Sequence, residues 1–288
     1  MDWLVSIDGN VVPGEEARIS VLDNGFTFGD SVYETIRTYG GRPLAWQRHI
    51  RRLRFSAGRL GITIPLSDDE LRRRLDDLLT RAGHPESYIR LIVSRGVGDI
   101  SYHFDRVKGP TVVMAVRSFD PPPDRSYAEG VPVAFVSIRR NHPSALDPAI
   151  KSCNLLNNIL AIREAQSKGG EEAVLLNHQG ELAEGSSSNL FVVRGGSAAT
   201  PPLDAGILPG ITREIVFEVG ARLGIPIREQ RLLPADLTGA DEAFLTSSTR
   251  DVLPICSVSG QPIGSGRAGP VTLRILEGFR EYALEHST

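Results

Sequence analysis

The segment Pro148-Ala149-Ile150-Lys151-Ser152-Cys153-Asn154-Leu155-Leu156 contains one of only three lysines among the 32 lysine and arginine residues of the chain. Lys151 is also the only charged residue between Pro148 and Ile162. A lysine amine can lose its proton and form a Schiff base with a carbonyl, whereas a guanidinium does neither near neutral pH. Lys151 is therefore a candidate catalytic residue. A surface lysine at the end of a strand is the plainer alternative.

Length and composition narrow the class of protein. The 288 residues favour about two domains, and 41% hydrophobic and 23% charged residues are typical of a soluble globular protein. A net charge of −3 gives no electrostatic footprint for nucleic acid. No apolar run reaches the roughly 20 residues that span a bilayer, and the N-terminus does not resemble a signal peptide. We expect a cytoplasmic protein that binds neither nucleic acid nor membrane.

The two cysteines, Cys153 and Cys256, do not by themselves make a disulfide framework or a four-ligand zinc site. We therefore expect no metal.

Helical and strand-like patterns mix along the whole chain, which predicts an α/β (α+β) fold. Ser67 followed by three acidic residues predicts the start of one helix. Strands are expected at 4–7, 11–12, 31–39, 87–95, 111–117, 131–138, 172–176, 189–193 and 243–246, and helices at 44–60, 67–81, 155–168, 212–223 and 270–285.

The strongest linker signal is Asp120-Pro121-Pro122-Pro123-Asp124, because consecutive prolines favour an extended backbone. It predicts an N-terminal α/β domain over 1–118, a linker over 119–130 and a C-terminal domain over 131–288.

An imine-forming lysine needs a carbonyl partner, and pyridoxal 5′-phosphate is the common cellular choice. Its phosphate requires a cup of donors, and its pyridine nitrogen requires an acid. The segment 208–213 leads into a helix whose first amides are donors, and Gly210 allows a ligand close approach. The four hydroxyls of 246–249 complete a candidate cup. Glu184, before a Gly-Ser tract, is the candidate acid.

Each of these features has a plainer interpretation. Thr212 can simply cap its own helix. The hydroxyls of 246–249 can belong to a solvated strand end, and Glu184 can be an exposed acid in a hairpin turn.

The first half offers further candidates. His49 and Arg52 share one helix face at i, i+3 spacing, and Arg52 can bind a phosphate as a planar bidentate donor. Other arginines crowd this helix, so a solvated basic face is the alternative. Tyr33, Arg37 and Arg95 lie in or just after strand-like runs and are candidate pocket residues, although spacing alone does not decide.

Six motifs, in order over nearly the whole chain, resemble those of the class IV (fold-type IV) pyridoxal-phosphate-dependent aminotransferases. This family includes branched-chain and D-amino acid aminotransferases and aminodeoxychorismate lyases. The motifs are Phe28-Gly29-Asp30-Ser31-Val32-Tyr33-Glu34, His49-Ile50-Arg51-Arg52-Leu53, Ile150-Lys151-Ser152-Cys153-Asn154-Leu155-Leu156, Glu184-Gly185-Ser186-Ser187-Ser188-Asn189, Ile207-Leu208-Pro209-Gly210-Ile211-Thr212-Arg213 and Thr246-Ser247-Ser248-Thr249.

The resemblance implies a role for each matching residue. Lys151 matches the lysine that forms the internal aldimine and moves the proton between Cα and C4′. Glu184 matches the acid at the pyridine nitrogen, and Arg140 matches an arginine near the phenolic side of the cofactor. The implied phosphate ligands are Arg52, the Ile211 and Thr212 amides, the Thr212 hydroxyl and Ser248.

The resemblance also implies a two-domain fold, with a smaller N-terminal α/β domain and a larger, barrel-like C-terminal domain. In this family the cofactor lies at the domain interface of a homodimer, and each subunit lends residues to the other's pocket.

The substrate signals disagree. Leu156 stands where branched-chain enzymes have a tyrosine that touches the cofactor, and in this it is similar to D-amino acid enzymes. The Arg-x-His carboxylate trap of D-amino acid enzymes is nevertheless absent from 94–103. The Arg95-Gly96-Val97-Gly98 stretch there is similar to branched-chain and broad-specificity members. Arg37 is the first candidate for binding the substrate carboxylate and Arg95 the second, with Tyr33 in the same pocket.

The expected function is therefore transfer of an amino group between an α-amino acid and a 2-oxo acid by a ping-pong mechanism. Branched-chain substrates are the first choice and D-amino acids the second, with an (R)-selective amine transaminase as a variant. An aminodeoxychorismate lyase that eliminates pyruvate is the alternative from another class. A protein that binds the cofactor without turnover is the third.

Overall fold

The computed structural model describes residues 2–288, and their backbone contacts divide the chain into two compact units. Unit 1 comprises the residues up to Asp120 together with Ile150–Asn154 and His286–Thr288. Unit 2 comprises Pro121–Ala149 and Leu155–Glu285. The segment that carries Lys151 thus packs as part of unit 1, although it lies beyond the expected linker in sequence.

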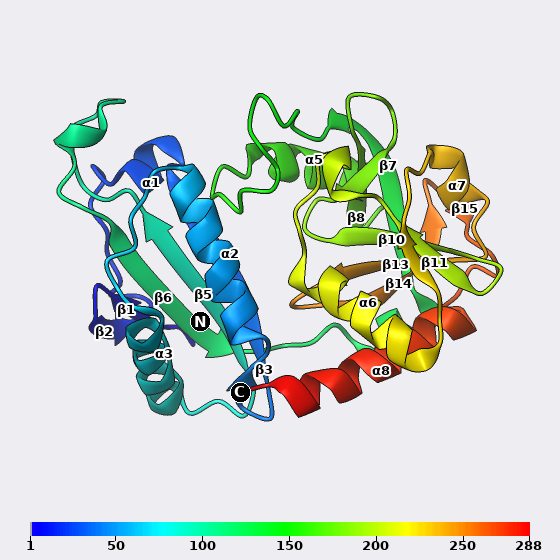
Figure 1. Ribbon diagram of the computed structural model, residues 1–288, viewed down its shortest axis with the longest axis horizontal. Coiled ribbons are helices and arrows are strands. Elements are labelled where there is room, and N and C mark those ends of the chain that lie inside the picture. Colours follow the sequence, from blue (N-terminus) through cyan, green and yellow to red (C-terminus); the bar gives the residue numbers. More distant parts are fainter. Residues whose placement is uncertain (1) are drawn as a thin grey trace. The chain divides into compact units, whose positions relative to one another are not determined.

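Unit 1 is a six-stranded antiparallel sheet with two long helices (Figure 1). The strand order is β2-β1-β6-β5-β3-β4. The strands are β1 Leu4–Ile7, β2 Asn10–Pro13, β3 Ser31–Tyr39, β4 Arg42–Pro43, β5 Ser87–Ser94 and β6 Thr111–Ser118; the helices are α1 Asn24–Phe28, α2 Trp46–Arg59, α3 Asp68–Ala82 and the short 3-10 helix Phe104–Arg106.

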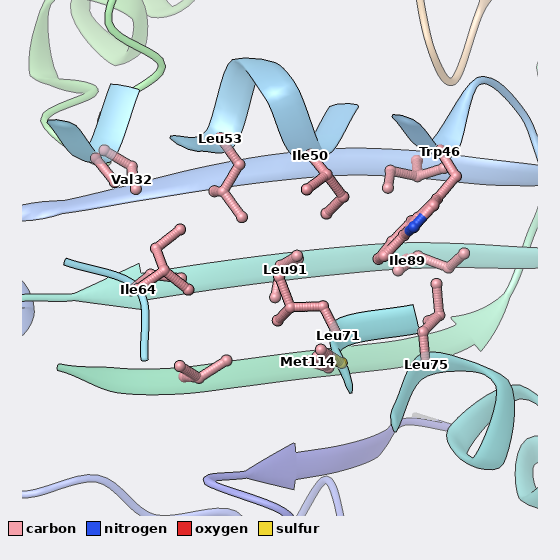
Figure 2. Packing of buried hydrophobic residues seen from close by; sticks show 14 of the residues in the cluster. Val32, Trp46, Ile50, Leu53, Ile64, Leu71, Leu75, Ile89, Leu91 and Met114 are labelled. Atoms are coloured by element: carbon pink, nitrogen blue, oxygen red, sulfur yellow. The ribbon is translucent and has the colours of Figure 1, made fainter. Parts of the chain in front are cut away.

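Alternation along the strands gives this sheet two different faces. Val32 and Ile36 of β3 are fully buried, and with residues of β5 and β6 they pack against α2 and α3 (Figure 2). Tyr33, Thr35 and Arg37 point to the other face and are half-buried. The first face therefore holds the core. The second, called the open face below, presents polar and aromatic side chains.

Unit 2 contains a nine-stranded sheet that curls on itself. Its order is β12-β11-β10-β13-β14-β7-β8-β9, and β15 pairs with β14. β9 ends this path, yet only residues 186–188 separate it from β10. This short connection requires the sheet to bend round, which confirms the expected barrel-like form.

The strands of unit 2 are β7 Val131–Arg139, β8 Glu172–Leu176, β9 Leu182–Gly185, β10 Asn189–Arg194, β11 Ser197–Thr200, β12 Ile227–Glu229, β13 Glu242–Ser247, β14 Asp251–Val258 and β15 Gln261–Pro262. The helices are α4 Asp124–Glu129, α5 Leu156–Ser167, α6 Ile211–Leu223, α7 Pro234–Thr238, α8 Pro270–His286 and the 3-10 helix Leu203–Ala205. The mixed α/β class expected from the sequence is confirmed.

The stretch expected to be an extended linker contains a helix. Pro123 is extended, with φ −62 and ψ 146, but α4 begins at the next residue. Proline fixes its own φ at a value that suits the residue before a helix, so the proline run serves as the entry to α4. Gly130 ends the helix, and its amide donates to the carbonyl of Ser126.

No helix within residues 2–288 combines the length and the apolar character that crossing a membrane requires.

Candidate active site

The backbone of Lys151 is fixed against β3. The Tyr33 amide donates to the Lys151 carbonyl at 2.9 Å, and the Lys151 amide donates to Ser56 Oγ of α2 at 3.1 Å. Ile150 packs against the core of unit 1, and Ser152 bridges to Val32. The packing of Ile150, which is partly buried, and the pairing of Ser152 hold the segment in place, while Lys151 stays partly exposed.

The Lys151 amine lies over an aromatic ring on the open face of the sheet. Its Nζ is 4.3 Å from the centre of the Tyr33 ring, and the Arg90 guanidinium lies 3.6 Å from the same centre. Arg90 Nη1 also donates to Thr35 Oγ1 at 3.3 Å. Two cationic groups and a tyrosine thus converge within unit 1.

Arg90 was not among the residues predicted from the sequence. The register of β3 and β5 pairs it with Thr35, so alternation places it on the same face as Tyr33. A sequence argument could have found it only by assuming this strand pairing.

Arg52 belongs to a buried ionic cluster. Its Nε and Nη2 each donate to a different oxygen of Glu34 at 2.7 Å, and His49 Nδ1 lies 2.7 Å from Glu34 Oε2. Burial opposes ionisation of Glu34, but Arg52 and His49 hold its pKa at about 2. Burial lowers the pKa of His49. The predicted shared helix face is confirmed, and in this structure the Arg52 fork binds Glu34.

Arg37 and Arg95, the two arginines predicted to bind the substrate carboxylate, make different contacts. Arg95 is 8% exposed; its Nε and Nη2 donate to Asp30, and Nη2 also donates to the Leu60 carbonyl at 2.7 Å. Arg37 lies between the rings of Tyr39 and Phe119, at 4.0 and 4.1 Å, on the open face of the sheet. Arg95 therefore holds loops of unit 1 together, whereas Arg37 shares a face with Tyr33.

In unit 2, Glu184 lies in a cage of donors. Arg140 Nε donates to its Oε1 at 2.7 Å, and the Leu208 amide and Asn189 Nδ2 donate to its Oε2 at 3.0 and 3.2 Å. Arg140 Nη1 reaches Asn157 Oδ1 at 3.1 Å. Glu184 is 4% exposed, so the exposed-acid interpretation is wrong. Charge-assisted donors of this kind favour the ionised carboxylate.

The N-terminus of α6 lies beside Asn189. No side chain caps this helix, whose N-cap is Gly210, so the interpretation of Thr212 as a plain cap is wrong. Asn189 Nδ2 also donates to the Leu208 carbonyl at 3.0 Å, and a Cβ on Gly210 would lie 1.9 Å from Asn189 Oδ1. The first helix amides have no intrahelical partner, which makes such a terminus suited to an anion.

The end of β13 adds hydroxyls to the same region, because Thr246 pairs with Asn189 across the sheet. Thr246 Oγ1 and Ser247 Oγ are buried without a hydrogen-bond partner among the residues that the structure describes. Ser248 follows in the turn and is half-buried. Buried polar atoms are almost always paired, so the Thr246 hydroxyl, in register with Asn189, indicates a place for a ligand.

The structure therefore brings the predicted residues together in two sets. Unit 1 groups Lys151 with Tyr33 and the unpredicted Arg90. Unit 2 groups Glu184 and Arg140 with the segments of 208–212 and 246–248, through Asn189. Across residues 2–288, no cluster of three or more histidine, cysteine or acidic side chains could hold a metal ion.

Comparisons with known proteins identify the family of the chain. The sequence pattern of the family described as Amino-transferase class IV matches residues 31–258. D-alanine aminotransferase of Listeria monocytogenes is 34% identical over 96% of this chain and 95% of its own length.

Three solved structures share the fold over nearly the whole chain. The branched-chain amino acid aminotransferase of Escherichia coli has a TM-score of 0.89 and 30% identity, and covers 99% of this chain and 95% of that chain. The branched-chain aminotransferase of Thermoproteus uzoniensis with norvaline has a TM-score of 0.89 and 34% identity, and covers 98% and 95%. The enzyme of Thermobaculum terrenum in its pyridoxal-phosphate form has a TM-score of 0.86 and 27% identity, and covers 98% and 94%. The chain belongs to the class IV aminotransferase family.

Proposed function

We propose that this protein uses pyridoxal 5′-phosphate to move an amino group between an α-amino acid and a 2-oxo acid. The observation that carries the proposal is Lys151: its backbone is fixed by β3 and α2, and its amine lies on the Tyr33 ring beside Arg90. A fixed lysine amine with an aromatic platform and a nearby cation suits a reaction on an anionic amino acid.

Unit 2 offers features that fit the cofactor. The uncapped start of α6 and the unpaired hydroxyl of Thr246 suit a phosphate. The caged carboxylate of Glu184 suits a protonated pyridine nitrogen, because a carboxylate is a strong acceptor for a charge-assisted hydrogen bond. Pyridoxal 5′-phosphate supplies a reactive carbonyl and an electron sink.

The protein's own residues would supply positioning and proton transfer. Lys151 would hold the cofactor through its amine, and that amine, once the substrate nitrogen has displaced it, would carry the proton that leaves the substrate Cα. The Ile211 and Thr212 amides, the Thr212 hydroxyl, Ser248 and Arg52 would hold the phosphate, which requires Arg52 to share its guanidinium with Glu34. Arg140 would hold Glu184 in its ionised form.

We assign the substrate carboxylate to Arg90 first and Arg37 second. Arg90 contacts the same ring as the Lys151 amine, whereas Arg37 lies further along β3. Arg95 is the least suited, since its donors are taken by Asp30 and a backbone carbonyl.

Branched-chain amino acids are the proposed donors, and D-amino acids the second candidate. All three solved structures described above are of branched-chain enzymes, whereas the Listeria relative is a D-alanine enzyme.

The test is a half-reaction of the purified holoenzyme with L-leucine or D-alanine alone. Transfer predicts loss of the long-wavelength cofactor band and release of the matching 2-oxo acid, and added 2-oxoglutarate or pyruvate should restore the band. A lyase would keep the band. Activity with D-alanine and none with L-leucine would reject the branched-chain assignment.

We also propose a homodimer. Leu156, Ile159 and Leu160 of α5 are 67%, 55% and 48% exposed, and their i, i+3, i+4 spacing puts them on one helix face. An apolar stripe of this kind favours a protein partner. Light scattering after size exclusion should give twice the chain mass of 31.3 kDa, and a monomer at micromolar concentration would contradict the proposal.

A further inference from the structure

Glu172, the first residue of β8, is a buried carboxylate that the proposed reaction does not use. It is 1% exposed. Within one turn it accepts hydrogen bonds from the Ser186 amide at 2.9 Å, from the Ser186 hydroxyl and from Ser187 Oγ at 2.9 Å. It also accepts a hydrogen bond from the guanidinium of Arg250, which lies in a second turn. Such a set of donors stabilises a charge that would otherwise be costly to bury.

The charge of Glu172 is maintained by these donors. Burial opposes ionisation, yet Arg250 and the serine hydroxyls lower the pKa of the carboxyl below its ordinary value. Arg250 Nη2 also contacts Ser187 Oγ. One nitrogen of the guanidinium is therefore shared between Glu172 and Ser187.

Of the two turns that meet at Glu172, one lies between Glu184 and Asn189, and the other contains the proposed phosphate ligand Ser248. Residues 186–188 connect β9, which ends one residue after Glu184, to β10, which begins at Asn189. Residues 248–250 connect β13 to β14 and include Ser248. One carboxylate thus joins the turn behind the ring-nitrogen acid to the turn of a phosphate ligand.

Both turns are tightly constrained. A Cβ on Gly185 would lie 2.3 Å from Ser188 Oγ and 3.3 Å from Glu172 Cγ. Asp251, which follows Arg250, has a φ of +54 and is 2% exposed. A non-glycine residue keeps such a backbone conformation only when its surroundings hold it there.

We propose that Glu172 is a positioning residue that, through Arg250 and Ser187, fixes the turn of residues 248–250 so that Ser248 faces the cofactor phosphate. The inference rests on the proposed function of unit 2. It predicts that loss of the Glu172 charge weakens binding of the cofactor's phosphate more than binding of the rest of the cofactor.

The test compares Glu172→Gln with Glu242→Gln. Glu242 is also the first residue of a strand and 8% exposed, but it accepts from the Val271 and Thr272 amides instead. Apoprotein is titrated with pyridoxal 5′-phosphate and with pyridoxal, and each variant's melting temperature is recorded. The affinity ratio is the affinity for pyridoxal 5′-phosphate divided by the affinity for pyridoxal. Because a charge-assisted hydrogen bond is lost, Glu172→Gln should lower this ratio at least about tenfold.

The control should leave that affinity ratio within about twofold even if it melts earlier. A lower melting temperature in both variants, with an unchanged ratio in both, would overturn the inference and leave Glu172 a purely structural residue. If the wild-type protein bound neither ligand, the proposed function itself would fail.

Should Glu172→Gln not fold, Arg250 provides a second variant, because its side chain is 22% exposed and reaches solvent. Arg250→Met should lower the affinity ratio, and Arg250→Lys, which keeps the charge, should restore part of it. Equal ratios in Arg250→Met and the wild type would equally overturn the inference.

Discussion

Arg140 Nε lies 2.7 Å from Glu184 Oε1, and both side chains are at most 10% exposed. Replacing one partner of a buried pair leaves the other charge uncompensated. We therefore expect Arg140→Met to lower the free energy of unfolding by about 3 kcal/mol in urea titrations. The control is Arg231→Met, whose guanidinium is 46% exposed and pairs with Glu181; it should cost less than about 1 kcal/mol. Equal losses would show that Arg140 does not stabilise Glu184.

The catalytic assignment of Lys151 can be tested with another lysine of the same chain as the control. Lys151→Ala should abolish both the long-wavelength band of the bound cofactor and amino transfer, because no other amine replaces it at this position. Lys168→Ala is the control: Lys168 is 46% exposed and pairs with Glu164, so both readouts should remain. Absorbance and a 2-oxo acid assay suffice. A band that survives Lys151→Ala would end the catalytic assignment.

The buried cluster around Glu34 predicts a pH dependence of stability. Its pKa is about 2 in the folded protein against an ordinary 4.5, so its contribution is complete above pH 4.5 and is lost as the pH falls toward 2. The loss should reach about 3 kcal/mol. Because His49 also titrates, Glu34→Gln is best compared in a His49→Gln background. Urea titrations between pH 5 and 3 should show a shallower decline with Glu34→Gln; parallel curves would contradict the assignment.

Substitution of Arg90 should change the KM for substrates, whereas substitution of Arg95 should change the free energy of unfolding. Arg90→Lys should raise the KM for amino acid and 2-oxo acid about tenfold or more while cofactor affinity stays unchanged, since a lysine lacks the planar fork that binds a carboxylate. Arg95→Lys should instead lower the unfolding free energy by about 2 kcal/mol, because it breaks the contacts with Asp30 and the Leu60 carbonyl. The reverse pattern, with KM changed only by Arg95→Lys, would restore Arg95 as the substrate residue.

Local patterns in the sequence predicted most of the long elements. Ser67 caps α3 as expected, with its hydroxyl accepting from the Glu70 amide, and the helices of 44–60, 212–223 and 270–285 differ from the structure by at most two residues at an end. These elements are set by neighbours along the chain. β14 was missed, because Pro254 inside it reads as a strand breaker.

The candidate site was harder to predict because its contacts are long-range. The fixed backbone of Lys151 depends on Ser56 and Tyr33, which lie far away in sequence. Arg90 becomes visible only with the pairing of β3 and β5. The hydrogen bond between Arg140 and Glu184 likewise depends on strand pairing, which places the end of β7 and β9 on either side of β8. Residue type and motif order identified the chemical groups, and only the fold shows which of them touch.

Substitution of Gly210 tests whether the Asn189 side chain must lie close to the start of α6. A Cβ there would lie 1.9 Å from Asn189 Oδ1, so Gly210→Ala must push away the side chain that donates to Glu184 and to the Leu208 carbonyl. We expect cofactor affinity to fall about tenfold or more, as one charge-assisted hydrogen bond is lost.

Gly58→Ala is the matched control for this substitution. Gly58 lies in α2, and a Cβ there meets nothing within 4 Å. The same change at that position should leave cofactor affinity unaltered and raise the unfolding free energy by about 0.5 kcal/mol, because alanine is the better helix former. If Gly210→Ala bound the cofactor as tightly as Gly58→Ala, the start of α6 would tolerate displacement of Asn189, and the proposed phosphate site there would be wrong.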